Sequence, residues 1–182
     1  MNAEFKTGDI VVEPTIGICN IEGVVQKTID GKTDLYYLFN SNSTRVYIAK
    51  SKIIERGVRK PMTSEEIKKI INLLKVPVTP QRTDLRTQYL HYRDIMKSGD
   101  PVTICKLLRD LYILEQQDDL KGKEKEIMEQ AMKFLVNEIS YVKDASKSQV
   151  TEQIHDALKT MFKKKQQKDK ITKKSTKKEE DQ

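Results

Sequence analysis

Residues 5–12, Phe-Lys-Thr-Gly-Asp-Ile-Val-Val, open a series of short apolar strands that ends at residues 57–59, Gly-Val-Arg. Beyond them the apolar residues recur every three to four positions, which is the spacing of an amphipathic helix. The change from a period of 2 to a period of 3.6 predicts an α+β chain with two modules. We expect a β-rich module over residues 1–62 and a helical module over residues 63–143.

The β-rich module contains five candidate strands, which cover residues 9–13, 17–28, 34–40, 44–49 and 52–54. Asp30-Gly31 suits a tight hairpin turn, because glycine accepts a positive φ without steric cost, and Val, Ile and Tyr fill the strands. A single sheet this small would leave its edges unpaired. The pattern therefore predicts a short five-stranded antiparallel barrel.

The helical module begins with a capping signal. Thr63 is followed three residues later by Glu66, so each side chain can accept a hydrogen bond from the amide of the other residue. Two prolines within residues 76–80 end this first helix. Three further helices are predicted. End signals indicate one from Asp84 to Gly99 and one from Asp100-Pro101 onward, and apolar spacing indicates one over residues 123–143. Four helices of this length can form a compact bundle.

The C-terminal part differs in composition. Residues 144–165 are predicted to form a linker and one more amphipathic helix, because apolar residues recur from Val150 to Phe162. Residues 166–182 are low-complexity and polar, so we expect them to be disordered. Residues 163–182 hold nine Lys and four acidic residues, and this net +5 is most of the chain's net charge of +7. This basic tail either contacts phosphate or keeps the chain in solution.

No group of residues suits catalysis, a cofactor or a metal ion. The seven glycines form no phosphate-binding motif. His91 and His155 stand alone on predicted helices, and Cys19 and Cys105 lack the close spacing of a metal site, so we expect both cysteines to be buried. The sequence predicts a binding protein rather than an enzyme, with no cofactor.

The sequence also bears on the compartment. No apolar run approaches the roughly 20 residues that cross a bilayer. The first residues lack the charged start and apolar stretch of a secretory signal. We therefore expect a cytoplasmic protein without a membrane partner, and we favour a monomer.

Several segments together resemble the CarD/CdnL family of bacterial transcription regulators, which bind RNA polymerase. The segments are residues 5–12, 17–24, 30–31, 45–48, 82–89, 97–100 and 107–111. Their order and spacing follow the family from residue 5 to about residue 143. The resemblance implies that the barrel is Tudor-like (SH3-like) and docks on the RNA polymerase β subunit, while the helical module faces promoter DNA.

The resemblance implies a polymerase-binding site at Lys27, Arg45 and Tyr47. In the family the barrel pairs with a segment of the β subunit by strand addition, in which main-chain hydrogen bonds give affinity. Lys27 matches the family's basic position before the hairpin turn. The family's Arg-Val-Pro strand reads Tyr-Ile-Ala at residues 47–49, and Arg45 lies two residues earlier on the same strand face. The alternative is that all three are ordinary solvated positions.

Leu85 occupies the position where many family members carry a tryptophan that wedges into the minor groove at the upstream edge of the melted promoter. Leucine is also an apolar wedge that can unstack a base step, although it lacks the stacking area of an indole ring. The alternative is that Leu85 begins a core stripe, because Leu85, Tyr89, Tyr92 and Met96 recur at helical spacing. Both interpretations remain open at this point.

Five basic residues near the starts of two predicted helices suit contact with DNA phosphates: Arg82, Arg86, Lys121, Lys123 and Lys125. The free amides of a helix N-terminus and nearby cationic side chains can bind the same phosphate. Arg86 and Lys125 lie at or beside basic positions of the family's DNA-facing patch, but Leu90 and Glu126 stand where relatives with a stronger patch are basic. The alternative is a solvated charged face.

The function implied by the resemblance is a transcription regulator that is held at the nucleoid through RNA polymerase. It would bind the β subunit and stabilise the open promoter complex through contacts, without sequence readout, at the upstream edge of the melted DNA. One alternative is a non-specific DNA-binding protein driven by the basic tail and the helical module. Another is an adaptor that binds only proteins.

Overall fold

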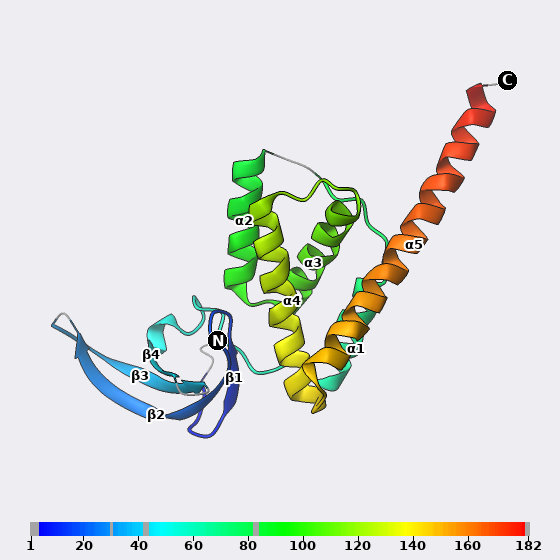
Figure 1. Ribbon diagram of the computed structural model, residues 1–182. Coiled ribbons are helices and arrows are strands. Elements are labelled where there is room, and N and C mark those ends of the chain that lie inside the picture. The colour runs from blue at the N-terminus through cyan, green and yellow to red at the C-terminus, as the bar shows by residue number, and fades with distance from the viewer. Residues whose placement is uncertain (1–3, 30, 42–43, 82–83, 181–182) are drawn as a thin grey trace.

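The structure is a computed structural model that describes residues 4–29, 31–41, 44–81 and 84–180, without the side chains of Leu85 and of residues 171–180. It is α+β, as predicted: a curled antiparallel sheet is followed by helices that pack into a separate bundle (Figure 1). The turn expected at Asp30-Gly31 falls partly outside the described residues, and Gly31 has a φ of +75°.

Four strands pair in chain order as an antiparallel meander: β1 (Ile10–Glu13), β2 (Gly17–Ile29), β3 (Lys32–Ser41) and β4 (Thr44–Ala49). A register shift between Ile21 and Gly23 marks a bulge in β2, and bulges bend and twist a strand. The curled sheet buries one face around Tyr37, Phe39 and Ile21. A half-barrel with its own apolar core results.

The predicted fifth strand is wrong, and the expected five-stranded barrel is a four-stranded half-barrel. Residues 50–52 form a short 3₁₀ helix, η1 (Lys50–Lys52), and the turn after it is held by local hydrogen bonds such as Arg56 N to Lys52 O at 2.9 Å. This turn buries Ile53 against the inner face of the sheet. What remains of the closing strand is one bridge, in which Val12 and Arg59 exchange backbone hydrogen bonds of 2.8 and 3.1 Å.

Four helices follow: α1 (Ser64–Leu74), α2 (Leu85–Ser98), α3 (Pro101–Gln116) and α4 (Gly122–Lys143). Their predicted ends are confirmed. The Thr63 hydroxyl accepts a hydrogen bond from Glu66 N, and the Glu66 carboxylate accepts one from Thr63 N. Gly99, at a φ of +65°, ends α2, and the Asp100 carboxylate caps α3. These local rules place the turns of the bundle.

The last helix, α5 (Lys147–Glu180), is longer than predicted. Its first half packs on α1 and α4 through five buried residues, Val150, Ile154, Ala157, Leu158 and Met161. Its second half projects away from the body (Figure 1). The disorder predicted for residues 166–182 is not confirmed, because the helix continues to Glu180. Lys and Gln are good helix formers, and a Lys165–Asp169 pair at 2.8 Å adds support.

The two cysteines are buried, as predicted, and belong to different cores. Burial raises the pKa of Cys19 to about 11 and that of Cys105 to about 12. Both thiols are therefore protonated at neutral pH. Within the described part of the chain, His, Cys, Asp and Glu side chains form no group of three that could hold a metal ion. No helix of the described residues is long and apolar enough to cross a membrane.

The backbone after η1 touches the backbone at the end of α2. Gly57 has a φ of +65°, and a Cβ atom there would clash with the carbonyl oxygen of Ser98. A Cβ atom at Gly99 would likewise lie only 2.5 Å from Cγ of Pro14. Glycine at both positions lets the half-barrel and the bundle lie in backbone contact.

Gly57→Ala is therefore expected to lower the free energy of unfolding by about 2–4 kcal/mol. The alanine would have to adopt a left-handed backbone conformation, and its Cβ atom would clash with the carbonyl oxygen of Ser98. Denaturant unfolding followed by circular dichroism measures this. Gly23→Ala is the matched control, since nothing lies within 4 Å of its would-be Cβ and its φ is not positive. Equal stabilities of the two variants would contradict the prediction.

Candidate functional site

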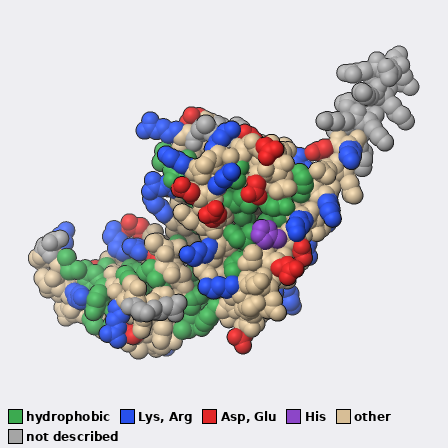
Figure 2. Space-filling view, in the orientation of Figure 1, with side chains coloured by type: hydrophobic (Ala, Val, Ile, Leu, Met, Phe, Trp, Pro, Cys, Tyr) green, Lys and Arg blue, Asp and Glu red, His purple; other side chains and the backbone are tan. Residues whose placement is uncertain are grey.

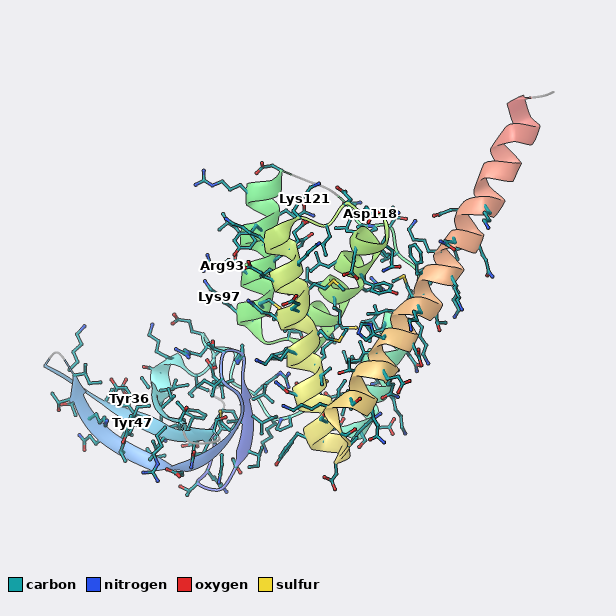
Figure 3. All side chains as sticks on the ribbon, viewed as in Figure 1. Tyr36, Tyr47, Arg93, Lys97, Asp118 and Lys121 are labelled. Atoms are coloured by element: carbon teal, nitrogen blue, oxygen red, sulfur yellow. The ribbon has the colours of Figure 1, made fainter. Side chains whose placement is uncertain are left out.

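The outward face of the half-barrel carries an apolar patch. Antiparallel partners share a face of a sheet, so the register of β2, β3 and β4 places five residues together: Val25, Lys27, Tyr36, Leu38 and Tyr47. We call these the outer-sheet patch. Tyr47 is the most open, with 42% of its surface exposed. Figure 3 shows Tyr36 and Tyr47 close together on the sheet.

Two of the predicted polymerase-binding residues meet within this patch. Lys27 Nζ lies 3.2 Å from the centroid of the Tyr47 ring, a cation–π contact that fixes both side chains. Arg45 is two residues from Tyr47 along β4, and its Nε pairs with Glu22 Oε2 at 3.0 Å. The structure thus brings Lys27 and Tyr47 into contact and leaves Arg45 beside them, with its charge partly neutralised.

The outer side of β4 is an open edge of the sheet next to this patch. The outer side of β1 is bridged by Arg59, whereas the outer side of β4 pairs with no strand of the described residues. Alternate amides of an edge strand point away from the sheet and can pair with another chain. β4 therefore combines free main-chain groups with an exposed aromatic side chain and neighbouring cations.

A second candidate surface lies at the end of the bundle away from the sheet. The N-termini of α2 and α4 both point to this end (Figure 1). Lys123 Nζ lies 5.3 Å from the Tyr89 ring centroid, which ties the start of α4 to α2. Arg86 is exposed on the first turn of α2. Arg82 and the side chain of Leu85 lie outside the described residues.

Of the other two predicted basic residues, Lys121 lies at this same end of the bundle but is paired with an acidic residue, and Lys125 lines another surface. Lys121 Nζ pairs with Asp119 Oδ1 at 3.1 Å, beside Asp118 at the top of the bundle (Figure 3). Lys125 lines a different groove, of about 520 Å³ between α4 and α5, together with Met128 and Met132. Of the basic residues predicted on α4, Lys123 alone makes contact with α2.

Two basic residues of α2 were missed by the sequence reasoning. Arg93 and Lys97 project from the same side of α2 (Figure 3), and Figure 2 shows Lys and Arg side chains along this outer side of the bundle. They follow Arg86 by seven and eleven residues, a spacing that keeps one helix face and was available in the sequence. None of the three forms an ion pair with another described residue. We call Arg86, Arg93 and Lys97 the α2 basic face.

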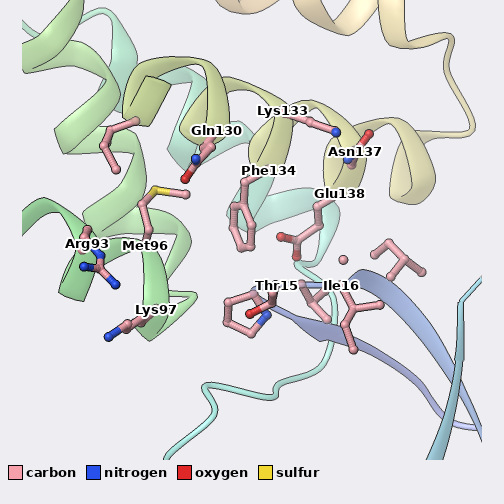
Figure 4. Close-up of a pocket in the computed structure, with 15 residues that line it drawn as sticks. Thr15, Ile16, Arg93, Met96, Lys97, Gln130, Lys133, Phe134, Asn137 and Glu138 are labelled. Atoms are coloured by element: carbon pink, nitrogen blue, oxygen red, sulfur yellow. The ribbon is translucent and has the colours of Figure 1, made fainter. Parts of the chain in front are cut away.

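A cleft of about 430 Å³ separates part of the half-barrel from the bundle (Figure 4). Arg93, Lys97 and Lys133 lie at its rim, and Phe134 points into it. Its acidic lining residue, Glu138, is bound to Arg59 and is 1% exposed. The α2 basic face therefore continues into a basic cleft at the junction of the two modules.

Comparison with known proteins finds a family model and a named relative. The family model described as "CarD, C-terminal domain" matches residues 69–155, which run from α1 into the buried half of α5. The chain is also similar to a protein of Bacillus subtilis (strain 168) named "Putative transcription factor YdeB". The two are 26% identical over 149 residues, which cover 80% of this chain and 97% of the relative.

These matches include the bundle that presents the α2 basic face, and the relative extends the similarity over most of the chain. The projecting end of α5 lies beyond the residues matched to the family model. The match over residues 69–155 and the similarity to "Putative transcription factor YdeB" together support a CarD/CdnL-family regulator.

Proposed function

We propose that the protein docks on the RNA polymerase β subunit through β4 and stabilises the open promoter complex through the bundle. The observation that carries the docking step is the open edge of β4 beside the Lys27–Tyr47 contact. A strand of the β subunit adds to this edge by main-chain hydrogen bonds, and Tyr47 with its neighbours covers the flank of the added strand. Lys27 and Arg45 set the register through charge.

In the docked state the α2 basic face and Lys123 contact DNA phosphates at the upstream edge of the melted region. Phosphate contacts position a protein on DNA without reading its sequence. The contacts that form only when the minor groove is opened favour the open complex over the closed one. Leu85, on the first turn of α2, is the apolar wedge that unstacks the boundary base step.

The test of this function is the lifetime of open complexes on a linear promoter after addition of a competitor. Wild-type protein is expected to lengthen it. Leu85→Ala is expected to weaken this stabilisation while the affinity for polymerase stays unchanged, because the wedge acts on DNA and β4 acts on protein. Equal loss of both activities, or an unfolded variant, would show that Leu85 is a core residue.

The alternative, a free DNA-binding protein, is favoured by the projecting half of α5. Lys163, Lys164 and Lys170 are exposed around and beyond Lys165, the last buried residue among the described side chains of this helix. A helix that leaves the body with several cations suits non-specific contact with duplex phosphates.

Removal of residues 163–182 separates the two functions. The alternative requires a steep salt dependence of duplex binding, about 0.9 in slope per neutralised phosphate, that disappears with the truncation. The proposed function expects the truncated chain to bind polymerase and lengthen open-complex lifetimes as the full chain does. Loss of promoter activity together with duplex binding would favour the alternative.

A further inference from the structure

The half-barrel and the bundle are joined by a buried ion pair between Arg59 and Glu138. We propose that this pair is a positioning element that fixes the angle between β4 and the α2 basic face. The inference rests on the proposed function, since the angle matters only if one surface holds polymerase while the other holds DNA. Arg59 and Glu138 are 79 residues apart in the chain.

Arg59 belongs to the half-barrel through its backbone. Its amide and carbonyl pair with Val12 of β1 at 3.1 and 2.8 Å. Its side chain leaves the sheet and crosses to the bundle. There Nε donates to the carbonyl oxygen of Gly99, between α2 and α3, at 2.8 Å. One residue therefore connects β1 to the end of the helix that carries the basic face.

Glu138 receives this side chain from α4. Arg59 Nη1 and Nη2 donate to Glu138 Oε1 and Oε2, each at 2.7 Å, and Met62 N donates to Oε1 at 2.7 Å. A fork-to-fork pair of this kind has one preferred geometry, because two parallel hydrogen bonds define a plane. Glu138 is 1% exposed and Arg59 is 24% exposed, so the pair is shielded from solvent on the carboxylate side.

Beside the ion pair, the junction contains the close approaches of Gly57 to Ser98 and of Gly99 to Pro14, and limited apolar packing. Most buried apolar residues of the half-barrel and of the bundle form separate cores, with Val12 of β1 counted in the bundle's core. The cleft lies beside Glu138 and separates part of the two modules (Figure 4). A buried ion pair often adds little net stability compared with apolar packing, but it selects one arrangement of the groups it joins.

The angle affects function because both surfaces must be engaged at once. When two sites are linked, the second contact forms at an effective concentration that depends on geometry, and it is lost if the geometry is wrong. A junction that hinges freely would keep polymerase affinity and bundle structure, yet it would present the α2 basic face to DNA only part of the time.

The test uses the full chain with spin labels on two exposed residues, Gln26→Cys on β2 and Glu152→Cys on α5. The native cysteines are buried, so labelling is directed to the introduced ones. Pulsed electron–electron double resonance should give one narrow distribution of distances between the two labels in the otherwise unchanged chain. Glu138→Gln, which keeps the shape but removes the charge, and Arg59→Lys, which keeps the charge but removes the fork, should both broaden or shift it.

Glu13→Gln is the matched control. Glu13 is also 1% exposed and accepts two hydrogen bonds from one arginine, Arg56, at 3.1 and 2.6 Å, but both residues belong to the half-barrel. It should lower stability without changing the label distances. Circular dichroism confirms that each variant is folded before its distances are compared.

The same variants are then tested on promoter complexes. Glu138→Gln and Arg59→Lys should shorten open-complex lifetimes about tenfold relative to wild type and leave polymerase affinity unchanged. Unchanged label distances in both variants would overturn the proposal, as would altered distances with a wild-type lifetime. If the wild-type protein had no effect on lifetimes, the proposed function would fail, and the distances would show separately whether the pair sets the angle.

Discussion

Tyr47→Ala is expected to lower the affinity of the full-length protein for core RNA polymerase by a factor of about 30. Truncating an aromatic side chain at the centre of a protein interface commonly costs about 2 kcal/mol. Tyr47 is exposed beside the open edge of β4, and its ring holds Lys27 in place, so its removal loses area and disturbs a neighbouring cation. Fluorescence anisotropy at about 0.3 M salt measures the affinity with long-range charge attraction screened.

Leu35→Ala is the matched control for this prediction. Leu35 is 44% exposed, much like Tyr47, and lies next to Tyr36 on β3, but the alternation of the strand turns it to the opposite face. It should bind polymerase as wild type does. A similar loss in both variants would mean that the effect comes from the stability of the sheet. An unchanged polymerase affinity for Tyr47→Ala would show that the docking surface does not include β4.

The second large effect is expected from charge reversal on the α2 basic face. Arg86→Glu combined with Arg93→Glu should shorten open-complex lifetimes about tenfold or more, because two phosphate contacts become repulsive. The salt slope of the lifetime should fall by about 2, at ~0.9 per phosphate. Polymerase affinity should not change, since these residues lie on the bundle. Filter-binding decay curves at several salt concentrations provide both quantities.

An equal change of charge elsewhere controls for long-range electrostatics. Lys69→Glu with Lys106→Glu alters two exposed residues on α1 and α3 by the same net charge. This variant should decay from promoters at the wild-type rate. If the two double variants behaved alike, net charge would explain the effect and the α2 basic face would have no special role.

The bundle was predictable because its boundaries depend on local chemistry. The side chains of Thr63, Asp84 and Asp100 accept hydrogen bonds from backbone amides of the first helical turn. Gly99 adopts the left-handed conformation that ends a helix. The closing strand was not predictable in the same way. Ile53 is buried by a turn after η1 instead of a strand, and short apolar segments fit either structure until the sheet exists to receive them.

The prediction of disorder for residues 166–182 failed for a related reason. Composition identified residues 166–182 as unable to form a core, which remains true, but a helix needs no core of its own when it continues one that is already nucleated. The packed segment from Val150 to Met161 provides that nucleus. Disorder and a solvated helical extension have the same composition, so the sequence did not distinguish them.

The candidate surfaces were predictable only where family resemblance or short spacing supported them. Lys27 and Tyr47 were named from the resemblance, and the sheet register brings them into contact. Arg93 and Lys97 follow helical spacing and were overlooked. The Arg59–Glu138 pair joins residues far apart in the chain, and no local pattern in the sequence marks either one. Long-range polar contacts of this kind appear only in the folded molecule.

The most direct test of the docking claim is hydrogen–deuterium exchange of the full chain with and without core RNA polymerase at about 0.3 M salt. If a strand of the β subunit adds to the open edge, amides within residues 44–49 become protected in the complex, while those of α2 exchange as in the free protein. Saturable binding without protection of β4, or with protection confined to α2, would contradict docking through this edge.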